Sequence, residues 1–220
     1  MALVLVTGSN RGVGLEMARQ FAARGDRVIA CARAGAPEGE GLEPVRLDVT
    51  EAGDLSALAG RLEGRALDLL VCNAGVLKGR GGVEDPSMDA AAFAETFAVN
   101  VTGVFMTVRA CLPALRRAKG KVAVISSQMG STERAKGSAY IYRASKAAAT
   151  NLAVCLSKEL EAEGIAVAAY HPGWVRTDMG GSGADISAGE SAAGLLARFD
   201  ELNLSTTGAF RFYSGEAIPF

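Results

Sequence analysis

The chain has 220 residues, 49% of them hydrophobic, which is long enough for one domain, residues 1–220, with a full apolar core. Its 23 Lys and Arg nearly balance its 24 Asp and Glu, so no basic surface for nucleic acid or anionic membranes is expected, and small-molecule partners are favoured. The apolar first residues lack a basic leader, so we expect a strand rather than a signal peptide, and no membrane span later. Four cysteines without paired spacing favour reduced thiols in a cytoplasmic protein.

The first predicted unit is a strand, a glycine-rich turn and a helix. An apolar run over 3–6 leads into TGSNRGVG at 7–14, and an amphipathic segment follows as far as Gly25. Glycines here permit a tight turn and a close approach of backbone amides to a pyrophosphate, which the helix N-terminus also attracts. We therefore predict a dinucleotide phosphate site at Gly8, Asn10, Arg11, Gly12, Val13 and Gly14.

The second predicted strand, 26–33, ends where a dinucleotide's adenosine ribose would be bound. An Asp or Glu at this point would accept a hydrogen bond from the ribose 2′-hydroxyl, but the strand ends in Arg33. Arg11 adds a second guanidinium from the glycine turn. Two guanidiniums suit a 2′-phosphate, so the pattern favours NADP(H) over NAD(H).

The third and fourth predicted strands end in further candidate cofactor contacts. After the third, 44–50, Asp48 could bind the adenine edge while Val49 packs on the ring, or Asp48 could be the N-cap of a helix over 51–62. The fourth, 67–75, ends in three residues small enough to let a cofactor lie against the backbone: Asn73, Ala74 and Gly75.

A glycine-rich loop over 76–88 and a long helix over 89–117 come next. Asn100 lies in an apolar part of this helix, and because a buried Asn needs hydrogen-bond partners, it is expected to have a structural or catalytic role. The fifth predicted strand, 121–131, carries Ser126, Ser127 and Ser131 at its carboxyl end, where open α/β sheets bind ligands.

Tyr142 and Lys146 lie four residues apart on a predicted helix over 139–163, so their side chains share one face. The ammonium favours the phenolate, and proton transfer near neutrality would require the pKa of Tyr142 to fall by roughly two to three units. A sixth strand then runs into the turn at His171, and a seventh is expected at 210–215. This alternation predicts a doubly wound parallel sheet with right-handed crossovers.

Six motifs follow one another along the chain: TGSNRGVG, Asn73-Ala74-Gly75, Asn100, the serines after 125, YRASK at 142–146 and HPG at 171–173. This order is typical of the short-chain dehydrogenase/reductase superfamily, which the whole chain resembles. Within it, HPGWVRTDMGG and the ending FRFYSGEAIPF resemble the C-factor and sniffer-type carbonyl-reductase-like branch.

The resemblance implies a single-domain Rossmann fold of about seven strands and a catalytic tetrad. Tyr142 would be the acid/base, and Ser127 would orient the carbonyl oxygen. Lys146 would also hold the nicotinamide ribose, and Asn100 would fix a water in a proton relay. The nicotinamide would be bordered by Pro172, Gly173, Val175 and Thr177.

Two choices within this tetrad depend on spacing. Tyr140 lies nearer than Tyr142 to the usual distance from Ser127, but its fourth following residue is Ala144, so no ammonium would activate it. Ser126 or Ser131 could replace Ser127 if the strand ended at a different residue.

The predicted activity is NADPH-dependent reduction of a ketone or aldehyde, or the reverse oxidation of an alcohol. The single histidine, His171, is a poor candidate for a hydrolase base, and no His/Cys cluster suggests a metal. A sensor that binds NADP(H) with little turnover is the alternative. The short segment between Thr177 and Ser187 predicts an open or mobile substrate site, and the helices 89–117 and 139–163 could form a homo-oligomer, dimer or tetramer.

Overall fold

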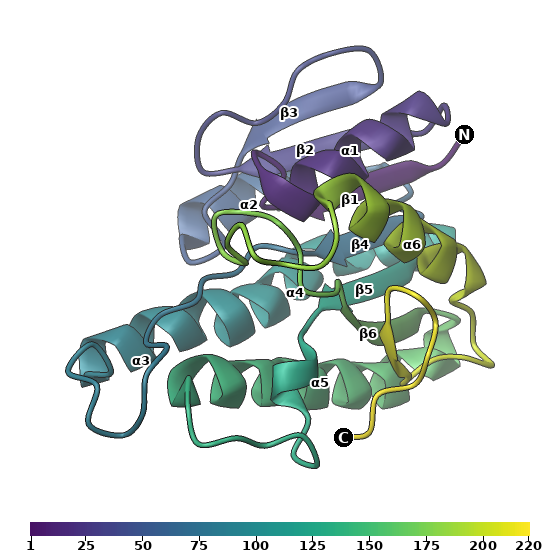
Figure 1. Ribbon diagram of the computed structural model, residues 1–220. Coiled ribbons are helices and arrows are strands. Elements are labelled where there is room, and N and C mark those ends of the chain that lie inside the picture. The colour runs from purple at the N-terminus through teal and green to yellow at the C-terminus, as the bar shows by residue number, and fades with distance from the viewer.

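The computed structural model describes all 220 residues as seven parallel strands between two layers of helices (Figure 1). The strand order is β3-β2-β1-β4-β5-β6-β7. The strands are β1 Leu3–Thr7, β2 Arg27–Ala32, β3 Leu42–Arg46, β4 Leu69–Cys72, β5 Lys121–Ile125, β6 Ala166–His171 and β7 Phe210–Phe212. The α-helices are α1 Gly12–Ala23, α2 Ala52–Arg61, α3 Ala90–Phe97, α4 Gly103–Ala118, α5 Tyr140–Leu160 and α6 Ala188–Glu201.

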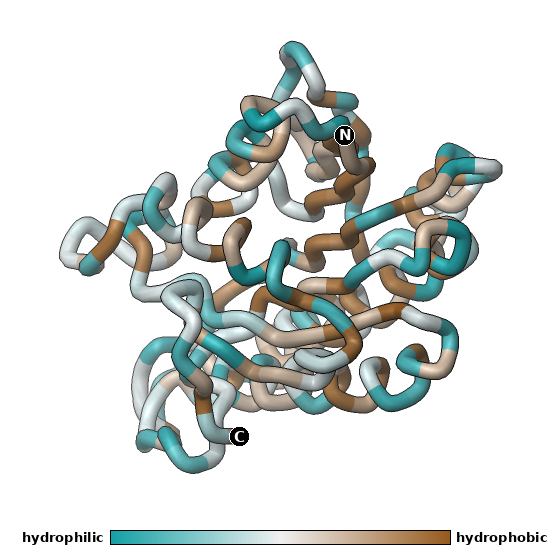
Figure 2. The backbone as a smooth tube through the Cα atoms, turned by 90° about the vertical axis from the view of Figure 1, so that its right-hand side faces the viewer, coloured by the Kyte–Doolittle hydropathy of each residue, from teal (hydrophilic) through white to brown (hydrophobic).

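The sheet has an apolar core on each face. Successive residues of a strand point to opposite faces, so Leu5 packs in one core while Val4 and Val6 pack in the other. Helices α2, α4 and α5 cover the first face, and α1 and α6 cover the second, where Phe21 stacks on Phe199 at 6.4 Å between ring centres. Figure 2 shows hydrophobic stretches through the middle of the molecule and hydrophilic ones on its outer turns.

Strand β1 lies between β2 and β4, so the strand order reverses direction at β1. The loops after β1 and β4 therefore separate to opposite sides of the sheet and leave a crevice at the carboxyl ends of the strands. The sheet is the predicted doubly wound, single-domain Rossmann fold.

Several element ends differ from the predictions. The fifth strand stops at Ile125 rather than continuing to 131, because Ser127 accepts a hydrogen bond from the Met129 amide and begins a short 3₁₀ turn, η2 Gln128–Gly130. The predicted helix over 89–117 is one continuous stretch with a π-helical turn, η1 Ala98–Thr102, in the middle.

We expected no stretch of the chain to be long and apolar enough to span a membrane, but by length and composition alone one helix is. Ala90–Ala118 is 29 residues long and contains an 18-residue window with a mean hydropathy of 1.4, which is long and apolar enough. In the fold, 44% of this apolar window is buried, and α4 packs on α2 and β4. The buried apolar side chains of α4 therefore cover one face of the sheet.

The four cysteines are all unpaired. Cys31 and Cys72 lie buried in β2 and β4, Cys111 is buried in α4, and Cys155 is exposed on α5. Burial raises the pKa of the three buried thiols, to about 12 for Cys111, so they act as small apolar side chains.

Candidate functional site

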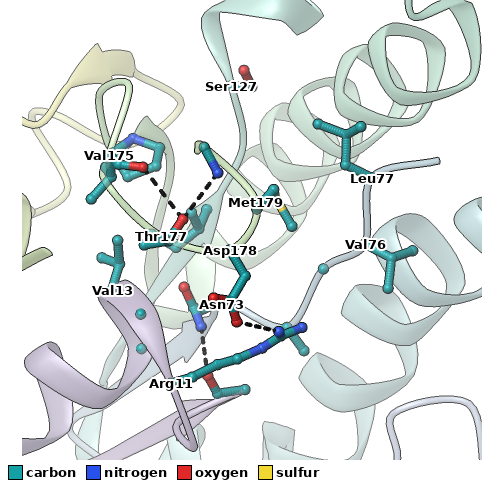
Figure 3. Close-up of a pocket in the computed structure, with 18 of the residues that line it drawn as sticks. Arg11, Val13, Asn73, Val76, Leu77, Ser127, Val175, Thr177, Asp178 and Met179 are labelled. Atoms are coloured by element: carbon teal, nitrogen blue, oxygen red, sulfur yellow. Dashed lines mark hydrogen bonds and ion pairs between the residues drawn. The ribbon is translucent and has the colours of Figure 1, made fainter. Parts of the chain in front are cut away.

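A single cavity of about 840 Å³ lies at the carboxyl ends of the strands (Figure 3). It brings the glycine turn after β1 together with Tyr142 of α5 and the segment that follows β6. All predicted site residues except Asn100 line it: Gly8, Asn10, Arg11, Gly12, Val13, Gly14, Arg33, Asp48, Val49, Asn73, Ala74, Gly75, Ser127, Tyr142, Lys146, Pro172, Gly173, Val175 and Thr177.

The glycines of the turn occupy positions that other residues would not fit. Gly8 and Gly12 have positive φ values of 67° and 55°. A Cβ on Gly14 would lie 2.2 Å from the Gly8 carbonyl oxygen and 2.4 Å from Nδ2 of Asn73. No side chain caps the N-terminus of α1, so its first N–H groups are available to phosphate oxygens. The turn therefore fits a dinucleotide pyrophosphate.

Asn73 fixes this turn to the next strand. Its Nδ2 donates to the carbonyl oxygens of Thr7 at 2.9 Å and Gly8 at 3.1 Å, and its backbone N–H donates to Oγ1 of Thr7 at 2.9 Å. The sequence predicted Asn73 as a small residue beside a cofactor. In the structure its amide also holds the phosphate-binding turn against β4.

The adenosine end of the cavity holds Arg33 and Asp48. Asp48 is not the N-cap of α2, which is Glu51. Instead, Oδ1 of Asp48 accepts hydrogen bonds from the Thr50 amide at 2.9 Å and hydroxyl at 2.7 Å. Burial raises the pKa of Asp48, but these hydrogen bonds, with the charges of Arg33 and Arg46, bring it below the ordinary value. Because Oδ2 has no partner, it can accept from a ligand.

At the other end of the cavity, Tyr142 and Lys146 are almost fully buried, at 8% and 5% exposed. Nζ of Lys146 donates to the Ile125 carbonyl oxygen at 2.8 Å and lies 5.7 Å from the centre of the Tyr142 ring. Burial raises the pKa of Tyr142 to about 12, although a hydrogen bond with Ser127 and the charge of Arg80 oppose the rise. Burial lowers the pKa of Lys146 to about 8.

The predicted lowering of the Tyr142 pKa by Lys146 is therefore wrong for this state of the protein. The ammonium lies over the ring and bonds to a backbone carbonyl, so desolvation of the phenol dominates. At neutral pH the phenol is protonated and the amine is charged.

Of the three candidate serines, Ser127 lines the cavity and has its hydroxyl beside Tyr142. Its Oγ accepts from the Met129 amide at 3.1 Å. Ser126 donates to the Lys146 carbonyl oxygen and bonds to Thr150, and Ser131 does not line the cavity. Tyr140 is 40% exposed and outside the cavity. The structure thus brings Ser127 and Tyr142 together.

Asn100 lies behind the cavity wall in the π-helical turn. Its Oδ1 accepts from the Val76 amide at 2.8 Å, and its Nδ2 donates to the Val76 carbonyl oxygen at 2.9 Å and to Oγ of Ser145 at 3.0 Å. A Cβ on Gly75 would lie 3.3 Å from Oδ1 of Asn100 and 3.5 Å from Nζ of Lys146. Asn100 therefore supports the cavity wall beside Lys146, and its predicted part in a water relay stays a prediction.

The segment from Trp174 to Gly180 lines the cavity, and hydrogen bonds fix it to the residues around it. The Trp174 indole donates to the Gly180 carbonyl oxygen at 2.9 Å, and Arg176 donates to the carbonyl oxygens of Ala184 and Asp185. Asp178 pairs with Arg11 at 2.7 Å across the cavity (Figure 3). The expectation that this short segment leaves the substrate site open or mobile stays a prediction.

The sequence profile of a family described as short chain dehydrogenase matches residues 2–185. The chain belongs to the short-chain dehydrogenase family. A relative named C-signal from Myxococcus xanthus is 40% identical over 156 residues, which covers 70% of this chain and 93% of the relative. A 1-hydroxy-2-glutathionyl-2-methyl-3-butene dehydrogenase from Rhodococcus sp. strain AD45 is 34% identical, with 100% of both chains covered. Among solved structures, an NADPH-bound carbonyl reductase from chicken fatty liver superposes with a TM-score of 0.89 at 31% identity, again over both whole chains.

Some cavity residues of this short-chain dehydrogenase were not predicted. Leu77, Met129 and Met179 line the cavity, and so does Arg80, which is exposed at its rim. They come from three loops without a shared motif, so only the fold brings them together. Trp174, the one tryptophan, was an available signal, because it follows directly after the predicted Pro172-Gly173 turn.

Proposed function

We propose that this short-chain dehydrogenase is an NADP(H)-dependent carbonyl reductase that reduces a ketone or aldehyde, or oxidises the corresponding alcohol. The observation that carries the proposal is the placement of Tyr142, Ser127 and Lys146 in one cavity with the glycine turn. A binding module would have no need for a buried phenol with a buried ammonium over its ring.

NADP(H) is favoured over NAD(H). Similar solved structures hold NADPH or NADP, among them the chicken carbonyl reductase and a Burkholderia multivorans family member that is 27% identical with a TM-score of 0.86. The glycine turn fits a pyrophosphate, and Arg11 and Arg33 supply guanidiniums for a 2′-phosphate. When bound, NADPH would supply the hydride.

The protein's own groups would handle the proton and orient the carbonyl. The Ser127 hydroxyl donates to the carbonyl oxygen of the substrate and places it beside the Tyr142 hydroxyl. Tyr142, protonated at neutral pH with a pKa of about 12, gives its proton to the developing alkoxide. The charged Lys146 then lies over the ring of the phenolate and stabilises it.

Replacement of Tyr142 by Phe tests this proposal. Removal of a general acid costs about 10² to 10⁴ in rate, so Tyr142→Phe is expected to lose at least about a hundredfold in NADPH oxidation with a panel of aldehydes and ketones. NADPH affinity, measured by fluorescence titration, is expected to stay close to wild type. Tyr140→Phe, two residues earlier in α5 and outside the cavity, is the matched control and should keep its rate. A wild-type rate in Tyr142→Phe would remove this residue from the mechanism.

A second candidate function is signalling through NADP(H) binding with little turnover. The observation that favours it is the 40% identity to the relative named C-signal. The same carbonyl panel separates the two, because tight NADPH binding without turnover of any carbonyl would support the sensor. A cytoplasmic location and a homo-oligomeric state stay predictions.

A further inference from the structure

Arg80, at the rim of the cavity, is a cation without an anionic partner. It lies in the loop between β4 and α3 and lines the cavity. Its only hydrogen bond runs from Nη2 to the Met179 carbonyl oxygen, at 2.5 Å, and it belongs to none of the molecule's ion pairs. The remaining N–H groups of the guanidinium are therefore free to bind a ligand.

The nearby acidic side chains are already engaged. Asp178 pairs with Arg11, and Glu95 pairs with Lys78. Asp85 turns back onto its own loop, where it accepts from the Gly81 amide at 3.0 Å and from Ser87. The charge of Arg80 is thus not compensated by any of these carboxylates.

The loop that carries Arg80 is fixed to the catalytic end of the cavity. The Gly81 carbonyl oxygen accepts from the Ala139 amide at 3.0 Å, and Ala139 is the residue directly before α5, the helix of Tyr142. Earlier in the loop, both backbone groups of Val76 bond to Asn100. The positive charge of Arg80 also acts on Tyr142, whose pKa it lowers against the effect of burial. Arg80 is thereby held near the phenol.

The cavity that Arg80 and Tyr142 share also has apolar side chains in its wall. Among them are Val76, Leu77, Met129, Trp174 and Met179. A ligand in this cavity therefore has the hydroxyls of Ser127 and Tyr142, apolar side chains and the Arg80 guanidinium available to it.

We propose that Arg80 binds a carboxylate of the substrate, so that the substrates are carbonyl compounds with an apolar body and a carboxylate distant from the reacting carbonyl. This rests on the proposed carbonyl reductase function, since the carbonyl end is defined by Tyr142 and Ser127. A guanidinium binds a carboxylate through two parallel N–H donors, which selects an acid over its ester.

Matched pairs of acids and esters test the proposal. Benzoylpropionate and benzoylbutyrate are each compared with the methyl ester as substrates with NADPH. We expect kcat/KM for at least one acid to exceed that of its ester by about tenfold or more, the size of one partly exposed charged hydrogen bond. In Arg80→Met, which keeps the stem of the side chain, this ratio is expected to fall to about one. Lys78→Met removes a cation from the same loop that is already paired with Glu95, and should keep the ratio.

The ratio separates a role in substrate binding from a general effect on Tyr142, because a changed phenol pKa acts on the acid and its ester alike. An acid preference that survives in Arg80→Met, or no preference in the wild type, overturns the proposal. If neither compound of any pair is turned over, the proposed function fails instead. The site at Arg80 is then tested by binding alone, measured as quenching of the fluorescence of Trp174, the single tryptophan, in protein with NADP⁺. If the acid binds the wild type and this binding is lost in Arg80→Met, the site is supported. If acid and ester bind equally, the proposal is overturned.

Discussion

At the scale of single residues, two exposed arginines are the proposed basis of the preference for NADP(H). Arg33 has no ion-pair partner, whereas Arg11 is paired with Asp178 in a solvent-exposed contact. An exposed pair of this kind contributes little, so a 2′-phosphate can replace Asp178 as the partner of Arg11 at small cost.

Simultaneous replacement of Arg11 and Arg33 by Ala should therefore weaken NADPH binding at least about tenfold more than NADH binding, since only NADPH carries the 2′-phosphate. Fluorescence titration of both cofactors measures the change. Arg19→Ala, an exposed arginine of α1 that pairs with Glu16, serves as control and should leave the ratio of affinities unchanged. Equal wild-type affinities for NADPH and NADH would contradict the assignment of the cofactor.

The sequence distinguished Tyr142 from Tyr140 by one neighbour, because Lys146 stands four residues after the former and Ala144 after the latter. The structure agrees in placing only Tyr142 in the cavity. The direction of its pKa shift was not predictable. It depends on burial of the phenol and on the Ile125 carbonyl oxygen, which accepts a hydrogen bond from the Lys146 ammonium. Ile125 lies in β5, a strand distant from Tyr142 in the sequence.

At the scale of elements, the π-helical turn η1 connects the long helix to the cavity wall. It contains Asn100, whose amide is the partner of both backbone groups of Val76. The sequence predicted that the Asn100 side chain would have hydrogen-bond partners. It could not identify Val76, because Val76 lies in a loop whose path no local pattern specifies.

Replacement of Asn100 by Ala should lower the free energy of unfolding by about 2 to 4 kcal/mol, because it leaves two backbone polar groups without partners. Denaturant unfolding measures the loss. Thr102→Ala, an exposed position of the same π turn, is the matched control and should change stability little. Wild-type stability of Asn100→Ala would show that water replaces the amide at no cost.

Strand and helix types were predictable, whereas their ends depended on side-chain hydrogen bonds. Apolar runs bounded by turn residues identified all seven strands. Asp48 was a reasonable N-cap by type, but its carboxylate is turned to Thr50, so α2 begins after Glu51 without a side-chain cap. An Asp side chain can accept hydrogen bonds from several nearby groups, and sequence spacing alone does not show which of them it binds.

At the scale of the whole molecule, the alternation of strands and helices predicted the doubly wound sheet, because parallel neighbours require crossovers of one hand. The apolar stretch Ala90–Ala118 shows the limit of composition. Its hydropathy permits a membrane span, and only the packing of α4 on α2 and β4 identifies it as a core helix.

The stability of the whole fold should depend on the protonation of His171. This side chain, 6% exposed, lies at the end of β6 with its ring against Phe212 at 5.3 Å, and its Nδ1 has no partner. Burial, with the charges of Arg134 and Lys146, lowers its pKa to about 4 from an ordinary 6.5.

Between pH 6.5 and 4 the unfolded chain therefore binds more protons than the folded one, so the contribution of His171 is full above pH 6.5 and is lost as the pH falls towards 4. The loss amounts to about 3 kcal/mol. Denaturant unfolding at a series of pH values should show a steeper decline for the wild type than for His171→Gln, which cannot gain a proton. Carboxylates titrate in the same range in both proteins, so the difference between the two curves isolates the histidine. Parallel curves would mean that His171 finds a partner for its charge in the folded state, and that the buried end of β6 tolerates an imidazolium.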